Sequence, residues 1–388
     1  QGLVQTGTVT FTEGDEVAPI DKDTITLLDE NGQPAASVDA KSPAGDVIGT
    51  FTVDKETGVV TFTPTDKSYS GDVVPVKVQA ADTNGTTVET TYTPKITPVA
   101  PTSEDATSTD IQGATQTGKP SFTEGNPNVP IDEDTPATFE DGSTTKTVDG
   151  EGTYTVSPDG TVTFVPEKSF TGTGTGVTVK RVDKNGTEIT AKYTPTVTPV
   201  TPTAAPAETT DIQGATQTGT PTFEGATVQV NGEDKAITIK DNSYTLLDND
   251  GNEVTSTPAY AADGTTEIGT YSIDSATGRV TFTPTDKSYT GVVTLAKVQA
   301  ESSNGIKVDT TYTPEIVPVT PTATPAETTD IQGATQTGKP EFKGGTVTVD
   351  GVEKTVEINE DVPATFDDGS TTKTVEGVGT YTVAADGT

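Results

Sequence analysis

The stretch GTFTVDKETGVVTFT, residues 49–63, decides the fold class. Phe51 and Val53 alternate with threonines, and after a turn that ends at Gly58 the apolar residues Val60 and Phe62 alternate in the same way. A period of two with β-branched residues on both faces is typical of a half-buried strand. This stretch therefore predicts a β-hairpin with one apolar face.

The chain contains four copies of one unit. The string DIQGATQTG begins at Asp110, Asp211 and Asp330, and a diverged copy, QGLVQTG, begins at Gln1. The first glycines of the four copies lie 111, 101 and 119 residues apart. Periods of this length are those of domains rather than of solenoid turns. The sequence therefore predicts a tandem array of small domains, which we call repeats 1 to 4.

The repeats differ in length within one segment only. Their framework aromatic residues keep a constant spacing at both ends, at Phe11, Phe122, Phe223 and Phe342 and in the pairs Tyr69/Tyr92, Phe170/Tyr193 and Tyr289/Tyr312. The length differences fall before the next framework phenylalanine, which is Phe62, Phe164 or Phe282. Repeats 1 and 3 carry a long form of this segment and repeats 2 and 4 a short form, as expected for loop or edge-strand insertions inside a constant frame.

Each of the first three repeats ends in a second predicted hairpin. Its turn is Asn-Gly, at Asn84, Asn185 and Asn304, and Asn-Gly tolerates the positive φ angles of a type I′ turn. No stretch shows a sustained helical period. Several short strands separated by turns in each repeat predict an all-β fold of tandem, small, Ig-like β-sandwiches.

Segments rich in proline and threonine separate the repeats. Proline removes hydrogen-bond donors and favours extended geometry, so we expect semi-rigid spacers that join the sandwiches end to end into an elongated rod. The predicted linkers are residues 101–109, 201–210 and 320–329. They separate repeat 1 (1–100), repeat 2 (110–200), repeat 3 (211–319) and a partial repeat 4 (330–388), which ends inside a hairpin turn and is not expected to close a core alone.

The amino-acid composition excludes most catalytic and metal-binding chemistry. The 388 residues include no Cys, His, Met or Trp, so most nucleophilic, metal-binding and proton-shuttling side chains are missing. Only 30% of residues are hydrophobic, which predicts small cores. The formal charge of −35 disfavours nucleic acid and anionic membranes as partners. No apolar run is long enough to span a bilayer and no signal-peptide pattern is present, so we interpret the sequence as a segment of a longer protein.

The repeats resemble a known family in several short motifs. GATQTGxPxF, GTYTV, TFTPTDKSYTG and YTPxxxPV recur in the same order and are followed by an acidic Thr/Pro segment. This arrangement is similar to the CshA-type fibril repeats of streptococcal surface adhesins. The resemblance covers the whole chain and implies a cell-wall-anchored, extracellular protein whose repeat array forms a stalk or fibril. The segment contains neither a non-repetitive ligand-binding region nor an LPxTG-like sorting signal.

The string GATQTGKP, residues 113–120, resembles a nucleotide-binding P-loop. Lys119 recurs only as Lys339, however, and the position that would donate a hydroxyl to magnesium is Pro120. Because no helix signal follows to direct a dipole at phosphate, we interpret the string as the beginning of each repeat.

Three other features, a calcium site, a glycosidase carboxylate pair and isopeptide bonds, each have a simpler interpretation. The acidic segment from Asp248 to Asn252 could bind calcium, but its glycine is misplaced for an EF-hand loop and a solvated hairpin turn explains it. Asp132 and Asp134 could serve a glycosidase, but little in this aromatic-poor chain supplies a sugar platform. Isopeptide bonds could join Lys67, Lys168 and Lys287 to Asn84, Asn185 and Asn304, but these asparagines lie in predicted exposed turns. We therefore predict no enzyme, no catalytic, cofactor-binding or metal-binding residues, and no cofactor.

The sequence favours a mechanical function. We expect a stalk that projects a distal adhesive region, with neighbouring repeats as the partners of each repeat, host or bacterial ligands reached only through other regions, and negative charge that opposes collapse. The alternative is that the variable segment, Phe11–Phe62 in repeat 1 and its equivalents, binds a host or bacterial ligand or mediates homotypic contact between cells.

Overall fold

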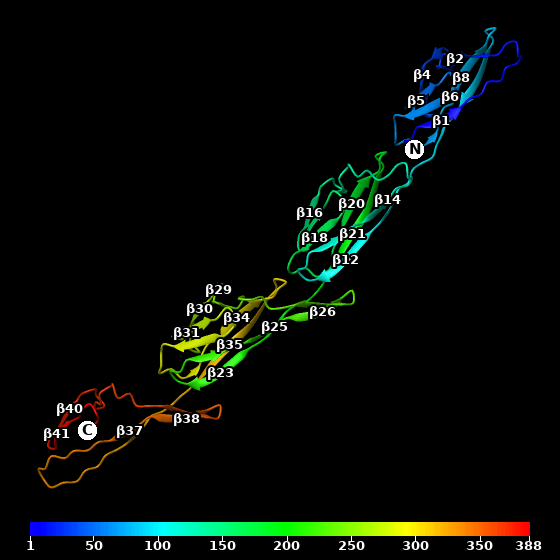
Figure 1. The fold of residues 1–388 in the computed structure, drawn as a ribbon. Helices are drawn as coiled ribbons and strands as arrows, with labels where there is room; N and C mark the ends of the chain where they lie inside the picture. Colours follow the sequence, from blue (N-terminus) through cyan, green and yellow to red (C-terminus); the bar gives the residue numbers. More distant parts are fainter. The chain divides into compact units, whose positions relative to one another are not determined.

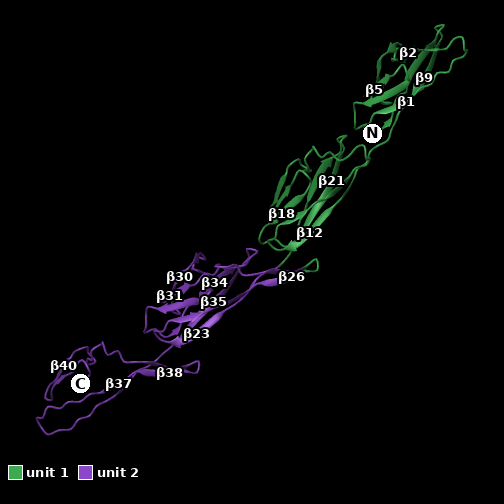
Figure 2. Cartoon of the chain, viewed as in Figure 1, with its two compact units in different colours: residues 1–199, 230–233 green, residues 200–229, 234–388 purple.

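The structure, a computed structural model that describes residues 1–388, consists of strands and turns only (Figure 1). It divides into two compact units, residues 1–199 with 230–233 and residues 200–229 with 234–388 (Figure 2). The prediction of an all-β fold of tandem β-sandwiches is confirmed. The structure contains no helix of the length and apolarity that crossing a membrane requires.

Repeat 1 packs two four-stranded sheets. The first has the order β1-β6-β5-β4, with β1 (Gln5–Thr8), β6 (Val59–Pro64), β5 (Val47–Val53) and β4 (Ser37–Lys41). The second has the order β3-β2-β8-β9, with β3 (Pro34–Ala35), β2 (Ile20–Leu28), β8 (Val76–Asp82) and β9 (Thr87–Tyr92). A short pair joins β7 (Gly71–Asp72) to β10 (Lys95–Ile96). The predicted hairpin of residues 49–63 is β5 and β6, and it places Phe51 opposite Phe62 with ring centroids 5.6 Å apart.

Repeat 2 repeats this plan and adds strands from the segment before it. One sheet has the order β13-β18-β17-β16, with β13 (Gln116–Gly118), β18 (Val162–Pro166), β17 (Gly152–Val156) and β16 (Thr145–Val148). The other has the order β12-β21-β20-β15, with β12 (Ala106–Ile111), β21 (Glu188–Thr198), β20 (Val177–Val182) and β15 (Thr138–Phe139). β19 (Gly172–Thr173) pairs with β21, and β11 (Thr102–Glu104) pairs with β14 (Ser121–Thr123).

Repeat 3 has the same arrangement. Its sheets are β24-β32-β31-β30, with β24 (Gln217–Gly219), β32 (Val280–Pro284), β31 (Glu267–Ile273) and β30 (Ser256–Tyr260), and β23-β35-β34-β28-β29, with β23 (Ala207–Ile212), β35 (Lys307–Val317), β34 (Ala296–Glu301), β28 (Thr245–Leu247) and β29 (Glu253–Val254). Smaller pieces are β33 (Gly291–Val292) beside β35, β22 (Thr203–Ala205) beside β25 (Thr222–Glu224), and the consecutive strands β26 (Ala226–Val230) and β27 (Glu233–Ile237).

Residues 322–388 form separate two-stranded pairs rather than a sandwich. β37 (Glu341–Lys343) pairs with β36 (Thr322–Thr324), β38 (Gly345–Val349) with β39 (Val352–Val356), and β40 (Thr372–Val375) with β41 (Gly379–Thr382). The framework residues Phe342 and Tyr381 are each 53% exposed, whereas in repeat 2 the equivalent Phe122 packs partly buried against the core and the equivalent Tyr154 is fully buried. The three hydrophobic cores lie in repeats 1, 2 and 3, as expected for a partial repeat 4 that does not close a core.

The predicted linkers need a correction. Residues 102–111 form β11 and β12, and residues 203–212 form β22 and β23, so the linkers predicted at 101–109 and 201–210 consist mostly of strands within the sandwiches that follow them. The linker predicted at 320–329 contains the short strand β36. Prolines occur between these strands rather than inside them, which leaves the backbone donors of the Ser, Thr and Ala residues free to pair.

The Asn-Gly hairpins also differ in turn type. Positive φ occurs at Gly85, Gly186 and Gly305 but not at the asparagines before them, so these turns are not type I′. In repeat 1 the Asp82 Oδ1 atom accepts the backbone N–H groups of Asn84 and Thr86 at 2.9 Å and 2.8 Å. This aspartate holds the asparagine in ordinary backbone geometry and leaves positive φ to the glycine.

Repeat 2 buries a carboxylate where its neighbours bury an isoleucine. Glu151 is 7% exposed and occupies the position of Ile48 and Ile268. Its carboxylate accepts hydrogen bonds from Thr175 N, at 2.9 Å, and from the hydroxyls of Thr175 and Tyr154. Burial alone would raise the pKa of Glu151, but these hydrogen bonds outweigh burial and lower the pKa from its usual 4.5.

We predict that repeat 2 loses stability on acidification partly through Glu151. Because the folded pKa is below the unfolded pKa, the contribution is present above pH 4.5 and disappears as the pH falls below it. The free energy of unfolding of repeat 2, measured by hydrogen exchange of its amides, should fall less steeply below pH 4.5 in Glu151→Gln than in the wild type. Glu140→Gln, at an exposed glutamate, is the matched control. Equal slopes for the wild type and Glu151→Gln would contradict the prediction.

Candidate functional site

The P-loop-like string is a structural element of the sandwich. Gln116–Gly118 is strand β13, and the Lys119 Nζ atom lies 2.9 Å from Asp159 Oδ2 instead of facing an empty anion site. Gly118 is required by packing, because a Cβ atom there would lie 2.2 Å from the ring of Tyr193. The same close approach occurs at Gly7 with Tyr92 and at Gly219 with Tyr312. The interpretation of this string as the beginning of each repeat agrees with its geometry.

The acidic residues considered for catalysis or calcium bind groups of the protein itself. The Lys184 ammonium binds Asp132 and lies 2.6 Å from Asp134 Oδ2, and the hydrogen bond from Lys184 lowers the pKa of Asp132 to about 2. Asp248 Oδ1 accepts the backbone N–H groups of Asp250 and Asn252 at 2.9 Å and 2.8 Å, as expected for a hairpin turn. No group of three or more acidic side chains is arranged to hold a metal ion.

Lys67 and Asn84, the pair considered for an isopeptide bond in repeat 1, lie at opposite ends of the repeat. The carbonyl oxygen of Ser68, next to Lys67, accepts a hydrogen bond from Gln1 Nε2 at 2.6 Å. The amino group of the same Gln1 donates to the carbonyl oxygen of Thr97 at 3.0 Å, so Lys67 lies near Thr97. Asn84 lies in the turn between β8 and β9, from which the chain runs along β9 and β10 before it reaches Thr97. Thirteen residues of extended chain span roughly 40 Å, so Lys67 and Asn84 are too far apart to be joined.

A buried polar network instead connects three strands in repeats 2 and 3. In repeat 2, Ser108 Oγ donates to Gln116 Oε1 at 2.6 Å and lies 2.6 Å from the hydroxyl of Tyr193. Gln116 Nε2 donates to the carbonyl oxygen of Thr196 at 3.0 Å. The network therefore joins β12, β13 and β21. Both polar atoms of the Gln116 side chain, Oε1 and Nε2, are hydrogen-bonded in it.

Repeat 3 reproduces this network with threonine in place of serine. Thr209 Oγ1 lies 2.7 Å from both Gln217 Oε1 and the Tyr312 hydroxyl, and Gln217 Nε2 donates to the carbonyl oxygen of Glu315 at 2.9 Å. Burial raises the pKa of Tyr193 and of Tyr312, so both hydroxyls stay protonated at neutral pH and can donate. Sequence analysis did not identify the network, although a hydroxyl residue eight positions before a glutamine recurs at Ser108, Thr209 and Thr328.

The network lies beside the pairing of the first and last strands of a repeat. β12 pairs in parallel with β21 over six residues, from Ala106 opposite Tyr193 to Ile111 opposite Thr198. β23 pairs in the same way with β35, from Ala207 opposite Tyr312 to Ile212 opposite Val317. A pull on the amino end of the first strand and the carboxyl end of the last strand slides the two strands past each other. All six pairs are then loaded together rather than one after another.

Within each unit, side chains also fix the segment that leaves a repeat. In the first unit, Gln1 Oε1 accepts the N–H of the buried Val99 at 2.7 Å, and Asn185 Nδ2 of repeat 2 donates to the carbonyl oxygen of Gln1 at 3.2 Å. In the second unit, Gln213 Oε1 accepts the N–H of the buried Val319 at 2.9 Å. The chain between sandwiches is therefore held by side chains of the repeat that it leaves.

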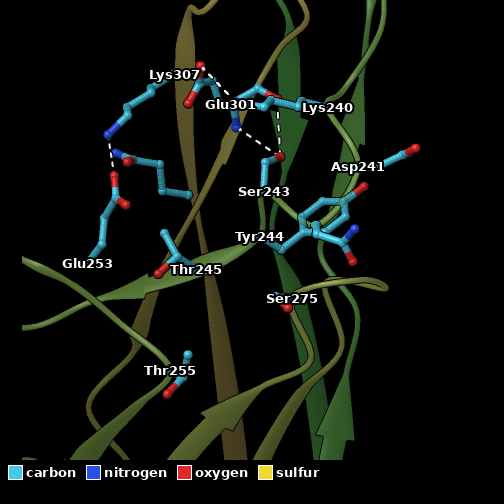
Figure 3. Close-up of a pocket in the computed structure, with 12 residues that line it drawn as sticks. Lys240, Asp241, Ser243, Tyr244, Thr245, Glu253, Thr255, Ser275, Glu301 and Lys307 are labelled. Carbon is cyan, nitrogen blue, oxygen red and sulfur yellow. Dashed lines mark hydrogen bonds and ion pairs between the residues drawn. The ribbon is translucent and has the colours of Figure 1, made fainter.

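The variable segment of repeat 3 contains a polar cavity of about 330 Å³ (Figure 3). Tyr244 and Ser243 lie on one side of it, and the ion pair of Lys307 with Glu253 lies on the other. Ser243 Oγ donates to the carbonyl oxygen of Glu301 at 3.1 Å. Repeat 1, the other long-form repeat, has the buried Ile25 at the position of Tyr244, so this tyrosine is not shared by the two long-form repeats.

Comparisons with known proteins identify the repeats. The family described as "Surface adhesin CshA repetitive domain" matches residues 1–96, 98–197, 199–316 and 318–388. Repeat domain 13 of the fibrillar adhesin CshA from Streptococcus gordonii, solved by NMR, is 64% identical over 18% of this chain and 90% of its own, with a TM-score of 0.12. No curated protein matches the chain.

Other solved structures are more distant. A tetra-tandem repeat from the extending region of a large adhesion protein is 19% identical over 90% of this chain and 80% of its own, with a TM-score of 0.22. The I9–I11 tandem of titin is 14% identical over 78% of this chain and 99% of its own, with a TM-score of 0.30.

We predict that the tyrosine hydroxyl stabilises repeat 3 through the polar network. Tyr312→Phe should lower the free energy of unfolding of repeat 3 by about 1 to 2 kcal/mol, because it removes the hydrogen bond between the Tyr312 hydroxyl and Thr209 Oγ1. Hydrogen exchange of amides in β23 and β35 measures this change. Tyr260→Phe, which removes a hydroxyl that forms no hydrogen bond in the structure, should have almost no effect. Equal effects of the two substitutions would contradict the role of the network.

Proposed function

This chain belongs to the family of CshA repetitive domains of surface adhesins, and we propose that it is a stalk segment that holds a distal adhesive region away from a bacterial cell wall. Membership of a surface-adhesin family places the protein at the cell surface. Attachment to the cell wall, and projection as the purpose of the array, are parts of the proposal.

The parallel pairing of first and last strands is the observation that carries this proposal. A stalk transmits force from one repeat to the next, so each repeat must resist a pull applied at its two ends. In repeats 2 and 3 that pull loads six residue pairs together, and the buried network of hydroxyl, glutamine and tyrosine crosses the same strands. Neither feature provides a catalytic group, and we propose no enzymatic activity.

The charge of the chain supports the same function. A formal charge of −35 makes the repeats repel one another. Repulsion between exposed charges favours separated repeats and opposes lateral association of neighbouring stalks. It is screened within about 10 Å at 0.1 M salt, so the effect depends on ionic strength.

A second candidate function has one observation in its favour. The cavity beside Tyr244 lies in the variable segment, and repeat 1 has Ile25 in place of this tyrosine, as expected if individual repeats bound different ligands. Most charges around it are already paired within the protein, including Lys307 with Glu253 and Lys240 with Glu301 at 3.7 Å. This pairing leaves few groups for a ligand, so we favour the stalk.

We predict that the maximum dimension of the 388-residue chain decreases as salt is added. Small-angle scattering between about 10 mM and 1 M salt spans the range in which the screening length falls from about 30 Å to about 3 Å. An extended particle that shortens with salt agrees with a stalk kept open by its charge. A compact particle whose dimension does not depend on salt would count against it.

Surface display separates the two functions. The experiment compares cells that display the same adhesive tip on arrays with different numbers of repeats. It also compares arrays of equal length that are built from repeat 2 alone or from repeat 3 alone. Stalk function predicts that adhesion follows the number of repeats and is equal for the two arrays of equal length. Adhesion that depends on which repeat is present, and that is lost in Tyr244→Ala, would support ligand binding and contradict the stalk.

A further inference from the structure

Repeat 4 carries a two-stranded hairpin that repeats 1 and 2 lack. β38 and β39 pair from Gly345 opposite Val356 to Val349 opposite Val352. The turn residues Asp350 and Gly351 have φ angles of +50° and +77°, the geometry of a tight type I′ turn. We call residues 345–356 the arm; Figure 1 marks it with the label β38. In repeat 2 the corresponding segment forms only the single bridge between Asn126 and Val129.

Repeat 3 carries an equivalent hairpin. Asn231 and Gly232 have φ angles of +51° and +82° and connect β26 to β27. Lys235 stands at the position of Lys354 when the two turns are aligned. The arm is therefore a recurrent element of the array, present in repeats 3 and 4 and absent from repeats 1 and 2.

The arm of repeat 4 contacts repeat 3 through charge. Lys354 Nζ lies 3.3 Å from Asp211 Oδ2, and both side chains are partly buried. Asp211 is the first residue of the DIQGATQTG string of repeat 3 and lies near the end of strand β23 of the sandwich. An aspartate occupies this position in each complete copy of the string, at Asp110, Asp211 and Asp330.

The arm also fits closely against the chain that leaves repeat 3. A Cβ atom at Gly345 would lie 2.5 Å from the carbonyl oxygen of Thr320 and 2.6 Å from Val319 Cγ1, so only glycine permits this approach. Val349, at the tip of the arm, is 5% exposed although it belongs to none of the three hydrophobic cores. Val352, directly opposite Val349 in the same hairpin, is 56% exposed. Paired residues project to the same side of a hairpin, so the difference lies between the strands: the arm is covered along β38 and open along β39.

We propose that the arm is a latch that docks a repeat onto the repeat before it, with the aspartate of DIQGATQTG as the receiving residue. Its partner is a neighbouring copy of the same domain, recognised by an ammonium–carboxylate pair, a buried valine and a glycine contact with the connecting chain. The inference goes beyond the stalk function, because it divides the joints of the array into latched and unlatched ones. It holds whether or not the array projects an adhesive tip.

The buried valine and the glycine contact contribute most of the docking. An ion pair between partly exposed side chains contributes little, and salt weakens it further. Burial of apolar surface does not depend on salt in this way. Lys354 therefore selects the receiving surface, and Val349 holds the arm against it.

Zero-length crosslinking of the unmodified 388-residue chain tests the contact. A carbodiimide joins an ammonium to a carboxylate only when the two are in contact, and peptide mass spectrometry identifies the joined residues. We expect a product that links Lys354 to Asp211, alongside the positive controls Lys119–Asp159 and Lys339–Asp386, which lie at 2.9 Å. Formation of both controls without the Lys354–Asp211 product would overturn the proposal.

Hydrogen exchange of the arm amides tests the docking independently. Lys354→Glu should speed their exchange about two- to fivefold, the range expected for loss of a partly exposed ion pair, and the exchanged pair Asp211→Lys with Lys354→Asp should restore it. Val349→Asp should speed exchange more than Lys354→Glu does. Val352→Asp, at an exposed valine on the open strand β39, is the matched control and should leave exchange unchanged. Equal exchange in Val349→Asp and Val352→Asp would contradict the latch.

Discussion

The parallel pairing of the first and last strands of a repeat is the interaction on which the rest of the structure depends. It places the point where the chain enters the sheet and the point where it leaves at opposite ends of one ladder, in β12 with β21 and in β23 with β35. It also brings Ser108 and Thr209 against the tyrosine and glutamine that complete each buried network. Since backbone hydrogen bonds carry this pairing, a chain with few apolar residues can still connect its terminal strands firmly.

The GATQTG string illustrates how the parts of one repeat depend on each other. Its first glycine has positive φ, at +82° in Gly113, and turns the chain from β12 into β13. Its glutamine, Gln116, joins the buried network, and its last glycine, Gly118, leaves room for the ring of Tyr193. A string that resembles a phosphate-binding loop is therefore explained by a turn, a hydrogen bond and a ring contact. The lysine and acidic residues considered for chemistry are paired on the surface, as Lys119 is with Asp159 and Lys184 with Asp132.

The sequence predicted those parts of the fold that depend on local patterns. The hairpin of residues 49–63 alternates apolar and polar residues, so both its strands and the pairing of Phe51 with Phe62 follow from its period. β12 was missed because its residues, ATSTDI, show no apolar alternation and pair with a strand more than 80 residues away. Proline near these residues suggested a spacer, although no proline lies inside the strand. The arm was missed despite a local signal, since Asn231-Gly232 and Asp350-Gly351 between alternating residues are a strong pattern for two-residue hairpins. The contact of Lys354 with Asp211 joins residues 143 positions apart and could not be predicted from either segment alone.

Pulling a single chain by its two ends tests the central claim that each repeat resists force through its parallel terminal strands. The account predicts abrupt, separate unfolding events for repeats 2 and 3, each lengthening the chain by roughly 300 Å, as expected when about a hundred residues are released. Tyr312→Phe should lower the unfolding force of one event and leave the other unchanged. Gradual extension without separate events, or unfolding forces that do not respond to Tyr312→Phe, would contradict the account.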